Sequence, residues 1–222
     1  MSVQRHNVFL VDDHPLVREW LGNLLRQQPD LSVCGEADNV TDALQGIADT
    51  NPAVAVVDLS LVDGWGLDLI KQLAYRAPET RTIVLSMHDE KLYAERMIRA
   101  GARGYVMKRE TAKVIVAAIR QVLRGELYVS APMQRLFAQR FVDKGRKSPP
   151  ASPIETLSDR ELEVFRLLGQ GLPTRQIAHS IGLSMKTVHS YYARMREKLK
   201  LANASELVRE AIRWCETESR GA

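Results

Sequence analysis

Short apolar runs that alternate with stretches of helical periodicity constrain the fold of the first 124 residues more than any other feature of the sequence. The runs are rich in Val, Ile and Leu, which is typical of strands buried on both faces of a sheet. They cover residues 8–11, 31–34, 54–57, 82–85 and 104–107. Strands that alternate with helices predict an α/β fold, in which a five-stranded parallel sheet is doubly wound, with helices on both of its faces.

Helical periodicity is clearest after the first and the fifth run. Apolar pairs recur every four residues from Leu16 to Leu25, and a similar stripe extends from Ile115 to Leu123. An apolar stripe of this kind is the face that a helix buries against a sheet. Because Trp20 lies within the first stripe, we expect its side chain to belong to the core.

The character of the sequence changes after residue 124. Ser130 can begin a short helix, and residues 144–153 are polar, rich in proline and without periodicity, as linkers are. From residue 155 onward the pattern is helical throughout. We therefore expect an α/β domain over residues 1–124, a linker with one short helix over 125–154, and a small all-α domain of four helices over 155–222.

Helix start signals divide the last segment. Ser158 with Glu161 forms a capping box, Thr174 and Ser184 are candidate N-caps of the next two helices, and Asn203 begins the last helix. The second and third helices are joined by a tight glycine turn at Gly182-Leu183. This is the layout of a helix-turn-helix, whose second helix enters the major groove of DNA.

Composition and charge restrict the cellular location and the partners that we expect for this chain. Only two cysteines are present, which excludes a disulfide framework and fits a reducing cytosol. No apolar run approaches the ~20 residues of a membrane helix, and the first residues lack the apolar core of a signal peptide. We therefore expect a cytoplasmic location and no membrane partner. The net charge is +4, and residues 174–200 are locally basic, with Glu197 as their one acidic side chain, which favours DNA as a partner.

Polar side chains follow directly after four of the five predicted strands. Asp12 and Asp13 follow the first strand, Asp58 the third, Ser86 the fourth and Lys108 the fifth. Sites in sheets of this kind form at the carboxyl ends of the strands. Three carboxylates gathered there repel one another unless a cation is present, and oxygen ligands favour Mg²⁺. The sequence therefore predicts a magnesium site at this edge of the sheet.

A single aspartate at a strand end is usually a helix cap or a solvated turn residue. The joint occurrence of polar residues after four strands favours one common site instead. His14 stands beside the acids, but Pro15 follows it at a helix start, and this favours a helix-start role for His14 over metal ligation.

Residues 7–124 resemble the receiver domain of response regulators. The matching motifs are Val11-Asp12-Asp13-His14-Pro15, Val57-Asp58-Leu59, Leu85-Ser86-Met87-His88 and Gly101-Ala102-Arg103-Gly104-Tyr105-Val106-Met107-Lys108. The resemblance implies a flavodoxin-like fold and a phosphoryl group transferred to Asp58 from a sensor histidine kinase or a small phosphodonor. It implies that Mg²⁺ is held by Asp12, Asp13, Asp58 and the backbone carbonyl of Ser60.

The same resemblance assigns roles to three further residues. It implies that Lys108 pairs with the aspartyl phosphate and that Ser86 turns its hydroxyl toward it. Tyr105 would then rotate into the space that Ser86 vacates, which changes the surface formed by the fourth helix, the fifth strand and the fifth helix.

Residues 155–216 resemble the LuxR/NarL-type DNA-binding domain. The matching motifs are Thr156-Leu157-Ser158-Asp159-Arg160-Glu161, Gly169-Gln170-Gly171, Gln176-Ile177-Ala178, Leu183-Ser184, Lys186-Thr187-Val188 and Lys198-Leu199. The whole chain thus resembles a NarL/FixJ-type two-component response regulator. This implies double-stranded DNA as a partner, a homodimer when phosphorylated, and RNA polymerase as a further candidate partner. The candidate DNA contacts are Thr174, Arg175, Lys186, Thr187, His189, Ser190, Arg194 and Lys198.

Two other functions fit part of the pattern. A Mg²⁺-dependent phosphohydrolase of the haloacid-dehalogenase type would use Asp58 as its nucleophile, but such enzymes place an acid/base Asp two positions later, where this chain has Ser60. The other alternative is a regulator that binds DNA constitutively, with a receiver that is never phosphorylated. Such a receiver would normally have lost some of the acidic residues of the phosphorylation site, whereas Asp12, Asp13 and Asp58 are all present here. We therefore expect a regulator whose receiver at most catalyses its own phosphorylation and dephosphorylation.

Overall fold

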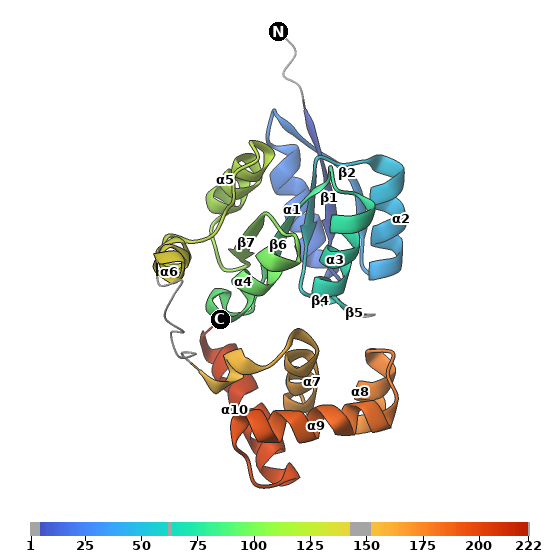
Figure 1. Cartoon of the computed structure of the whole chain (residues 1–222). Helices are drawn as coiled ribbons and strands as arrows, with labels where there is room; N and C mark the ends of the chain where they lie inside the picture. Colours follow the sequence, from blue (N-terminus) through green and yellow to red (C-terminus); the bar gives the residue numbers. More distant parts are fainter. Residues whose placement is uncertain (1–4, 62–63, 143–151, 222) are drawn as a thin grey trace. The chain divides into compact units, whose positions relative to one another are not determined.

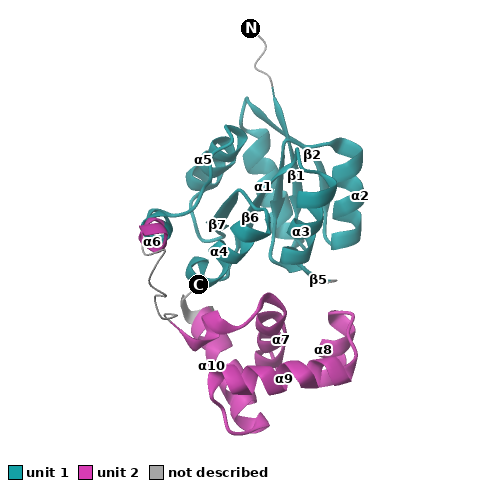
Figure 2. Cartoon of the chain, viewed as in Figure 1, with its two compact units in different colours: residues 1–137 teal, residues 138–222 magenta. Residues whose placement is uncertain are grey.

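A computed structural model of the chain describes residues 5–61, 64–142 and 152–221. These residues form two compact units, Met1–Phe137 and Ala138–Ala222 (Figure 2). The short helix expected after Ser130 is present as α6 (Ala131–Val142), and the division between the units falls within it. Most of the predicted proline-rich linker, residues 143–151, lies outside the described residues.

The first unit extends beyond the predicted boundary at residue 124. Tyr128 forms a parallel bridge with Gly104 beside the last strand, and its backbone carbonyl accepts a hydrogen bond from the Tyr105 amide. Val129 and Met133 are almost completely buried. Residues 125–137 therefore pack with the α/β unit, although the sequence pattern assigns them to the linker.

All five predicted strands are present in one parallel sheet (Figure 1). Its strand order is β2-β1-β3-β6-β7. The strands are β1 (His6–Val11), β2 (Leu31–Ala37), β3 (Val54–Val57), β6 (Arg81–Ser86) and β7 (Gly104–Met107). This order confirms the doubly wound fold, because the chain moves from the centre toward one edge and then returns toward the other.

Helices cover both faces of the sheet. One face packs against α1 (Pro15–Arg26) and α5 (Ala112–Leu123), and the opposite face packs against α2 (Val40–Thr50) and α3 (Gly66–Arg76). A further helix, α4 (Glu90–Ala100), contacts α3 and β7. Figure 1 shows this layered arrangement, in which the carboxyl ends of all five strands lie at the same edge of the sheet.

A close steric fit fixes β2 and α2 against β1. The ring of Phe9, which is buried in β1, occupies space beside two glycines. A Cβ at Gly35 would lie 2.4 Å from the ring, and a Cβ at Gly46 would lie 2.6 Å from it. Both glycines are therefore required for the ring to lie where it does, since real Cβ atoms do not approach so closely.

The expectation that Trp20 belongs to the core is wrong. Its side chain is 44% exposed and that of Leu16 is 80% exposed, whereas Leu21 and Leu25 are buried. The buried stripe of α1 is therefore narrower than the apolar stripe in its sequence. An apolar pair every four residues spans more of the helix surface than the sheet can cover.

The second unit is helical throughout its described part, as expected. After the end of α6, its described part continues from residue 152 with a 3₁₀ turn, Pro153–Thr156, followed by α7 (Asp159–Gly169), α8 (Thr174–Ser180), α9 (Met185–Leu199) and α10 (Ala204–Gly221). The apolar interior includes residues from each of the four helices, namely Leu162, Phe165, Ile177, Val188, Met195, Leu207 and Ala211.

Three of the four predicted helix starts are confirmed. The Ser158–Glu161 capping box begins α7, Ser184 accepts a hydrogen bond from the amide of Thr187, and Asn203 accepts one from the amide of Glu206. The N-cap of α8, however, is Pro173, and Thr174 is the first helical residue rather than the cap. A proline before the helix supplies an extended residue but no side-chain acceptor.

Candidate functional site

Strand ends position the acidic residues. Asp12 and Asp58 each follow directly on a strand, and backbone hydrogen bonds continue past those ends, from Asp58 N to Val11 O (2.8 Å) and from Asp12 N to Ala37 O (3.1 Å). On the other side of β3, Lys108 N donates to Ser86 O (2.8 Å). The ladder of the sheet therefore holds these backbones rigidly, which fixes where their side chains begin.

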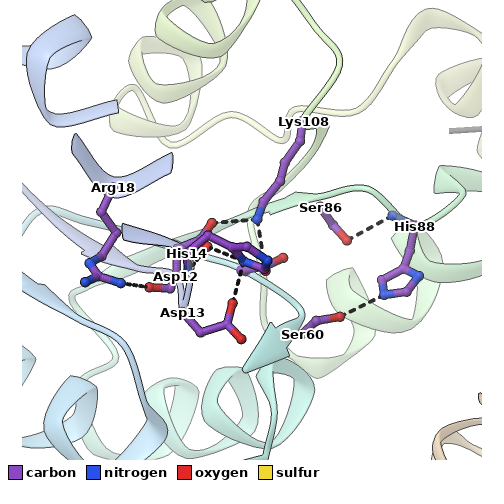
Figure 3. Close-up of polar contacts among 9 residues, drawn as sticks. Asp12, Asp13, His14, Arg18, Ser60, Ser86, His88 and Lys108 are labelled. Carbon is purple, nitrogen blue, oxygen red and sulfur yellow. Dashed lines mark hydrogen bonds and ion pairs between the residues drawn. The ribbon is translucent and has the colours of Figure 1, made fainter. Parts of the chain in front are cut away.

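A lysine joins two buried carboxylates. Nζ of Lys108 lies 2.6 Å from Oδ2 of Asp12 and 3.0 Å from Oδ2 of Asp58. Asp12 and Asp58 are 7% and 4% exposed. Figure 3 shows Lys108 reaching toward the acidic group from the last strand of the sheet. The structure thus brings together side chains that are 96 positions apart in the sequence, as the strand-end pattern predicts.

Asp13 and His14 lie next to the two buried carboxylates. Together with Asp12 and Asp58 they offer ligand atoms that all lie within 4.8 Å of one another. Oδ1 of Asp13 is buried and has no hydrogen-bond partner among the described residues, although Nδ1 of His14 lies 2.6 Å away. A buried carboxylate oxygen without a hydrogen bond is costly unless a cation or water binds it. The residues present therefore fit a divalent cation such as Mg²⁺.

Electrostatics at this site favour an additional cation. Burial raises the pKa of Asp58, and the carboxylate of Asp12 raises it further, against the lowering effect of Lys108. Burial by itself would lower the pKa of Lys108, but Asp58 and Asp12 outweigh it and raise that pKa. One lysine is thus shared by more negative charge than it neutralises, which is the situation that a bound cation relieves.

A second group of contacts lies beside the acids and centres on His88, a residue for which the sequence predicted no role. His88 Nε2 and Ser60 Oγ are hydrogen-bonded at 2.9 Å, and the His88 amide donates to Ser86 Oγ at 3.1 Å (Figure 3). Ser60 lies in a small hairpin, β4 (Ser60–Leu61) and β5 (Gly64–Trp65). Its two strands have only two residues each, which is too short for a periodic pattern, so the sequence does not predict them.

The two predicted switch residues are both buried. Ser86 and Tyr105 have no exposed surface, and the Tyr105 hydroxyl donates to the carbonyl of His88 at 2.7 Å. Tyr105 thus already lies inward while the Ser86 oxygen accepts the hydrogen bond from His88. The hydroxyl of Ser60, two residues after Asp58, is likewise engaged with His88, and no carboxylate stands at that position for the phosphohydrolase mechanism.

In the second unit, α9 presents a polar face opposite a buried one. Val188 and Met195 are completely buried, while Lys186, His189 and Arg194 are exposed. The remaining predicted contacts in the two helices are the exposed Arg175 and Ser190, the half-buried Thr174 and Thr187, and Lys198. The candidate contacts on α9 therefore lie away from its buried side chains Val188 and Met195.

Aromatic side chains organise this polar face. The Arg194 guanidinium lies 5.8 Å from the centre of the Tyr191 ring, and the ring of His189 meets that of Tyr192 edge-on at 5.6 Å. The hydroxyls of Tyr192 and Thr174 are 3.4 Å apart, which links α9 to the start of α8. These contacts restrict the side chains before any ligand binds.

Lys198 differs from the other candidates. Its Nζ lies 2.6 Å from Oε2 of Glu161 and donates to the carbonyl of Thr156. Burial raises the pKa of Glu161, but hydrogen bonds from Lys198 and Ser158 outweigh it and lower that pKa. The charge of Lys198 therefore helps to hold α9 against the start of α7.

Comparison with known protein families identifies both units. Residues 8–120 match the response regulator receiver domain, and residues 155–211 match the luxR family of bacterial regulatory proteins. The oxygen regulatory protein NreC of Staphylococcus epidermidis is 31% identical over 210 residues, which are 93% of this chain and 96% of NreC. NreC of Staphylococcus aureus is 32% identical over 209 residues, with the same coverage.

Solved structures agree. RcsB from Salmonella enterica serovar Typhimurium, bound to a promoter in the presence of the phosphomimetic BeF₃⁻, is 26% identical and covers 94% of this chain and 98% of its own, with a TM-score of 0.71. ChrA, a response regulator of a heme-sensing two-component system, is 28% identical with a TM-score of 0.51, over 95% and 97% of the two chains. This chain therefore belongs to the response regulators that join a receiver domain to a LuxR-type DNA-binding domain. In its described parts, no helix has the length and apolarity needed to cross a membrane.

Proposed function

We propose that this response regulator acts in the cytoplasm, that its Asp58 accepts a phosphoryl group from a sensor histidine kinase, and that this modification changes how the second unit binds DNA. The observation that carries the proposal is the buried Asp58 carboxylate, with Lys108 Nζ 3.0 Å from it and the acids of the neighbouring strand beside it. A phosphoryl acceptor needs positioning and charge neutralisation more than acid/base groups, and this site supplies both.

The acidic group would hold Mg²⁺ through Asp12, Asp13, Asp58 and the backbone carbonyl of Ser60. The ion would neutralise negative charge on the phosphoryl group when bound. Lys108 is already placed to pair with a phosphate on Asp58, since its Nζ contacts that carboxylate.

Two other side chains would respond to the phosphate. Ser86 would turn its hydroxyl toward the phosphate and donate its proton to a phosphate oxygen. The phosphate would thereby favour the inward position of Tyr105, which the ring occupies here, and with it one arrangement of the surface formed by α4, β7 and α5. Such a modification shifts a pre-existing equilibrium by the free energy with which the phosphate favours one arrangement over the other.

The DNA surface would consist of α9 and the start of α8. Lys186, Thr187, His189 and Ser190 would face base edges and phosphates, with Arg194 farther along the same helix; Thr174 and Arg175 would meet the backbone, and Lys198 would flank the surface. Dimeric binding to paired half-sites would match the RcsB dimers seen on DNA. RNA polymerase is a further proposed partner of the DNA-bound form.

The test begins with selection of a binding site from random DNA with the phosphorylated protein. Acetyl phosphate and Mg²⁺ should tighten binding of the wild-type protein to that DNA and should have no effect on Asp58→Asn. Asp49→Asn, at an exposed position on α2, is the matched control and should respond as the wild type does. Equal stimulation of Asp58→Asn would refute Asp58 as the acceptor.

The DNA surface is tested separately. Arg194→Ala should weaken binding and reduce the slope of log K against log salt by about one, as expected when one phosphate contact is removed. Arg135→Ala, at an exposed position on α6, is the control and should keep the wild-type slope. An unchanged slope in Arg194→Ala would remove this side chain from the DNA contacts.

A further inference from the structure

His88 is hydrogen-bonded to three residues that take part in the proposed function, namely Ser60, Ser86 and Tyr105. Its imidazole Nε2 is hydrogen-bonded to the Ser60 hydroxyl at 2.9 Å. Its amide donates to Ser86 Oγ at 3.1 Å, and its carbonyl accepts from the Tyr105 hydroxyl at 2.7 Å. One residue of the loop before α4 therefore connects the loop after Asp58 with both predicted switch residues, as Figure 3 shows for Ser60 and Ser86.

The backbone contacts prepare Ser86 for its proposed role. A serine hydroxyl can accept one hydrogen bond and still donate its own proton. Because the His88 amide donates to Ser86 Oγ, the oxygen is fixed in place while its proton stays available for a phosphate. Any residue other than proline at position 88 could make this contact and the one to Tyr105, since both use only the backbone.

The side-chain contact is different, because it requires a group that reaches Ser60. The imidazole is hydrogen-bonded to the Ser60 hydroxyl and also contacts the ring of Tyr93 on α4, with the two ring centres 5.0 Å apart. The backbone of Ser60 belongs to the segment that directly follows Asp58. The imidazole therefore connects that segment to the loop that carries Ser86, across 28 positions of sequence.

We propose that His88 is a positioning residue for phosphoryl transfer, and that the hydrogen bond between its imidazole and Ser60 holds the segment after Asp58 in register with Ser86. This inference rests on the proposed function of Asp58. Without the hydrogen bond, the Ser60 carbonyl and the Ser86 hydroxyl can move independently. The affinity for Mg²⁺ then falls because the Ser60 carbonyl is one of the proposed ligands. The rate of phosphorylation falls as well, because it needs both the bound ion and the Ser86 hydroxyl in place.

The variants separate this contact from the others. His88→Ala removes the imidazole but keeps both backbone contacts, and Ser60→Ala removes the partner hydroxyl. His88→Gln keeps a side-chain amide that can donate or accept at about the position of Nε2. His6→Ala, at the opposite end of β1, is the matched control. The measurements are Mg²⁺ affinity by calorimetry with the metal alone, and the rate of phosphorylation by acetyl phosphate.

We expect His88→Ala and Ser60→Ala each to lower the phosphorylation rate and the Mg²⁺ affinity by about twofold to tenfold, the range that one net hydrogen bond supplies. His88→Gln should recover most of both, and His6→Ala should behave as the wild type. The double variant should be no worse than the more impaired single variant, because the two changes remove the same interaction.

Three results would overturn the proposal: wild-type values in His88→Ala, a His88→Gln variant as impaired as His88→Ala, or fully additive effects in the double variant. The second of these would assign the effect to packing on Tyr93 instead. Failure of the proposed function is recognised separately, since Asp58→Asn would then be phosphorylated as the wild type is. If His88→Ala does not fold, the Ser60→Ala and His88→Gln variants decide the question.

Discussion

Replacing Lys108 with methionine removes the cation between Asp12 and Asp58 while retaining most of the apolar stem. The two ion pairs that this change breaks are 2.6 and 3.0 Å long, and the lysine side chain is 11% exposed. Breaking a buried ion pair costs about 3–5 kcal/mol, because it leaves buried charge without compensation. Here the Asp58 carboxylate can take up a proton, because burial already raises its pKa, so we expect the lower end, about 3 kcal/mol at neutral pH without Mg²⁺.

The loss of stability in Lys108→Met should increase as the pH rises. Burial and the neighbouring Asp12 already raise the pKa of Asp58 in the folded chain, and loss of Lys108 raises it further. A carboxyl whose folded pKa lies above its unfolded pKa destabilises the fold as pH rises through that interval. The deficit of Lys108→Met should therefore be small near pH 4 and complete at pH 7.

Calorimetric melting of the full chain in EDTA, at several pH values, measures this effect. The receiver transition is the one that Mg²⁺ shifts in the wild type, and about 3 kcal/mol corresponds to a fall of about 10 °C in its Tm. Lys113→Met, at an exposed position on α5, is the control and should melt as the wild type does. A fall of less than about 2 °C at pH 7, or an equal fall at pH 4, would refute the reasoning.

Three other predictions concern the second unit. Ser158→Ala removes the cap of α7 and should lower the free energy of unfolding by about 1 kcal/mol in urea denaturation, whereas an unchanged midpoint would show that the cap is dispensable. Gly169→Ala would place a methyl 2.4 Å from the Ala211 carbonyl oxygen and 2.5 Å from Cys215 Sγ, so the same assay should show a loss of about 1–3 kcal/mol; wild-type stability would contradict this close packing. Burial raises the pKa of the Cys215 thiol to about 11, which leaves roughly 200-fold less thiolate at pH 8 than in a free cysteine. Alkylation followed by mass spectrometry should therefore accelerate about tenfold per pH unit, and a rate independent of pH would refute that shift.

The sheet and its acidic edge were predictable because their signals are local. Each strand is a short apolar run, and the residue after the run marks the carboxyl end of that strand. Because the carboxyl ends of parallel strands lie at one edge of the sheet, the residues Asp12, Asp58 and Lys108 meet there. Capping residues such as Ser158 and Ser184 are equally local, since the acceptor and the amide it binds are three residues apart.

Features that depend on contacts between distant segments were not predictable in this way. The role of His88 arises because two loops 28 residues apart meet, and neither loop has a periodic pattern. Trp20 was misassigned because a stripe in the sequence cannot show how far the covering sheet extends. The pairing of Lys198 with Glu161 similarly joins the ends of two helices, which sequence spacing within α9 alone does not reveal.

The fit of Phe9 between Gly35 and Gly46 makes substitutions at these three positions epistatic. An alanine at either glycine would collide with the ring, while a smaller residue at position 9 alone would leave a void. A lineage that acquires side chains at positions 35 or 46 must therefore first reduce the residue at position 9 and tolerate a less stable ancestor. Steric size thus dictates the order in which this part of the receiver can evolve.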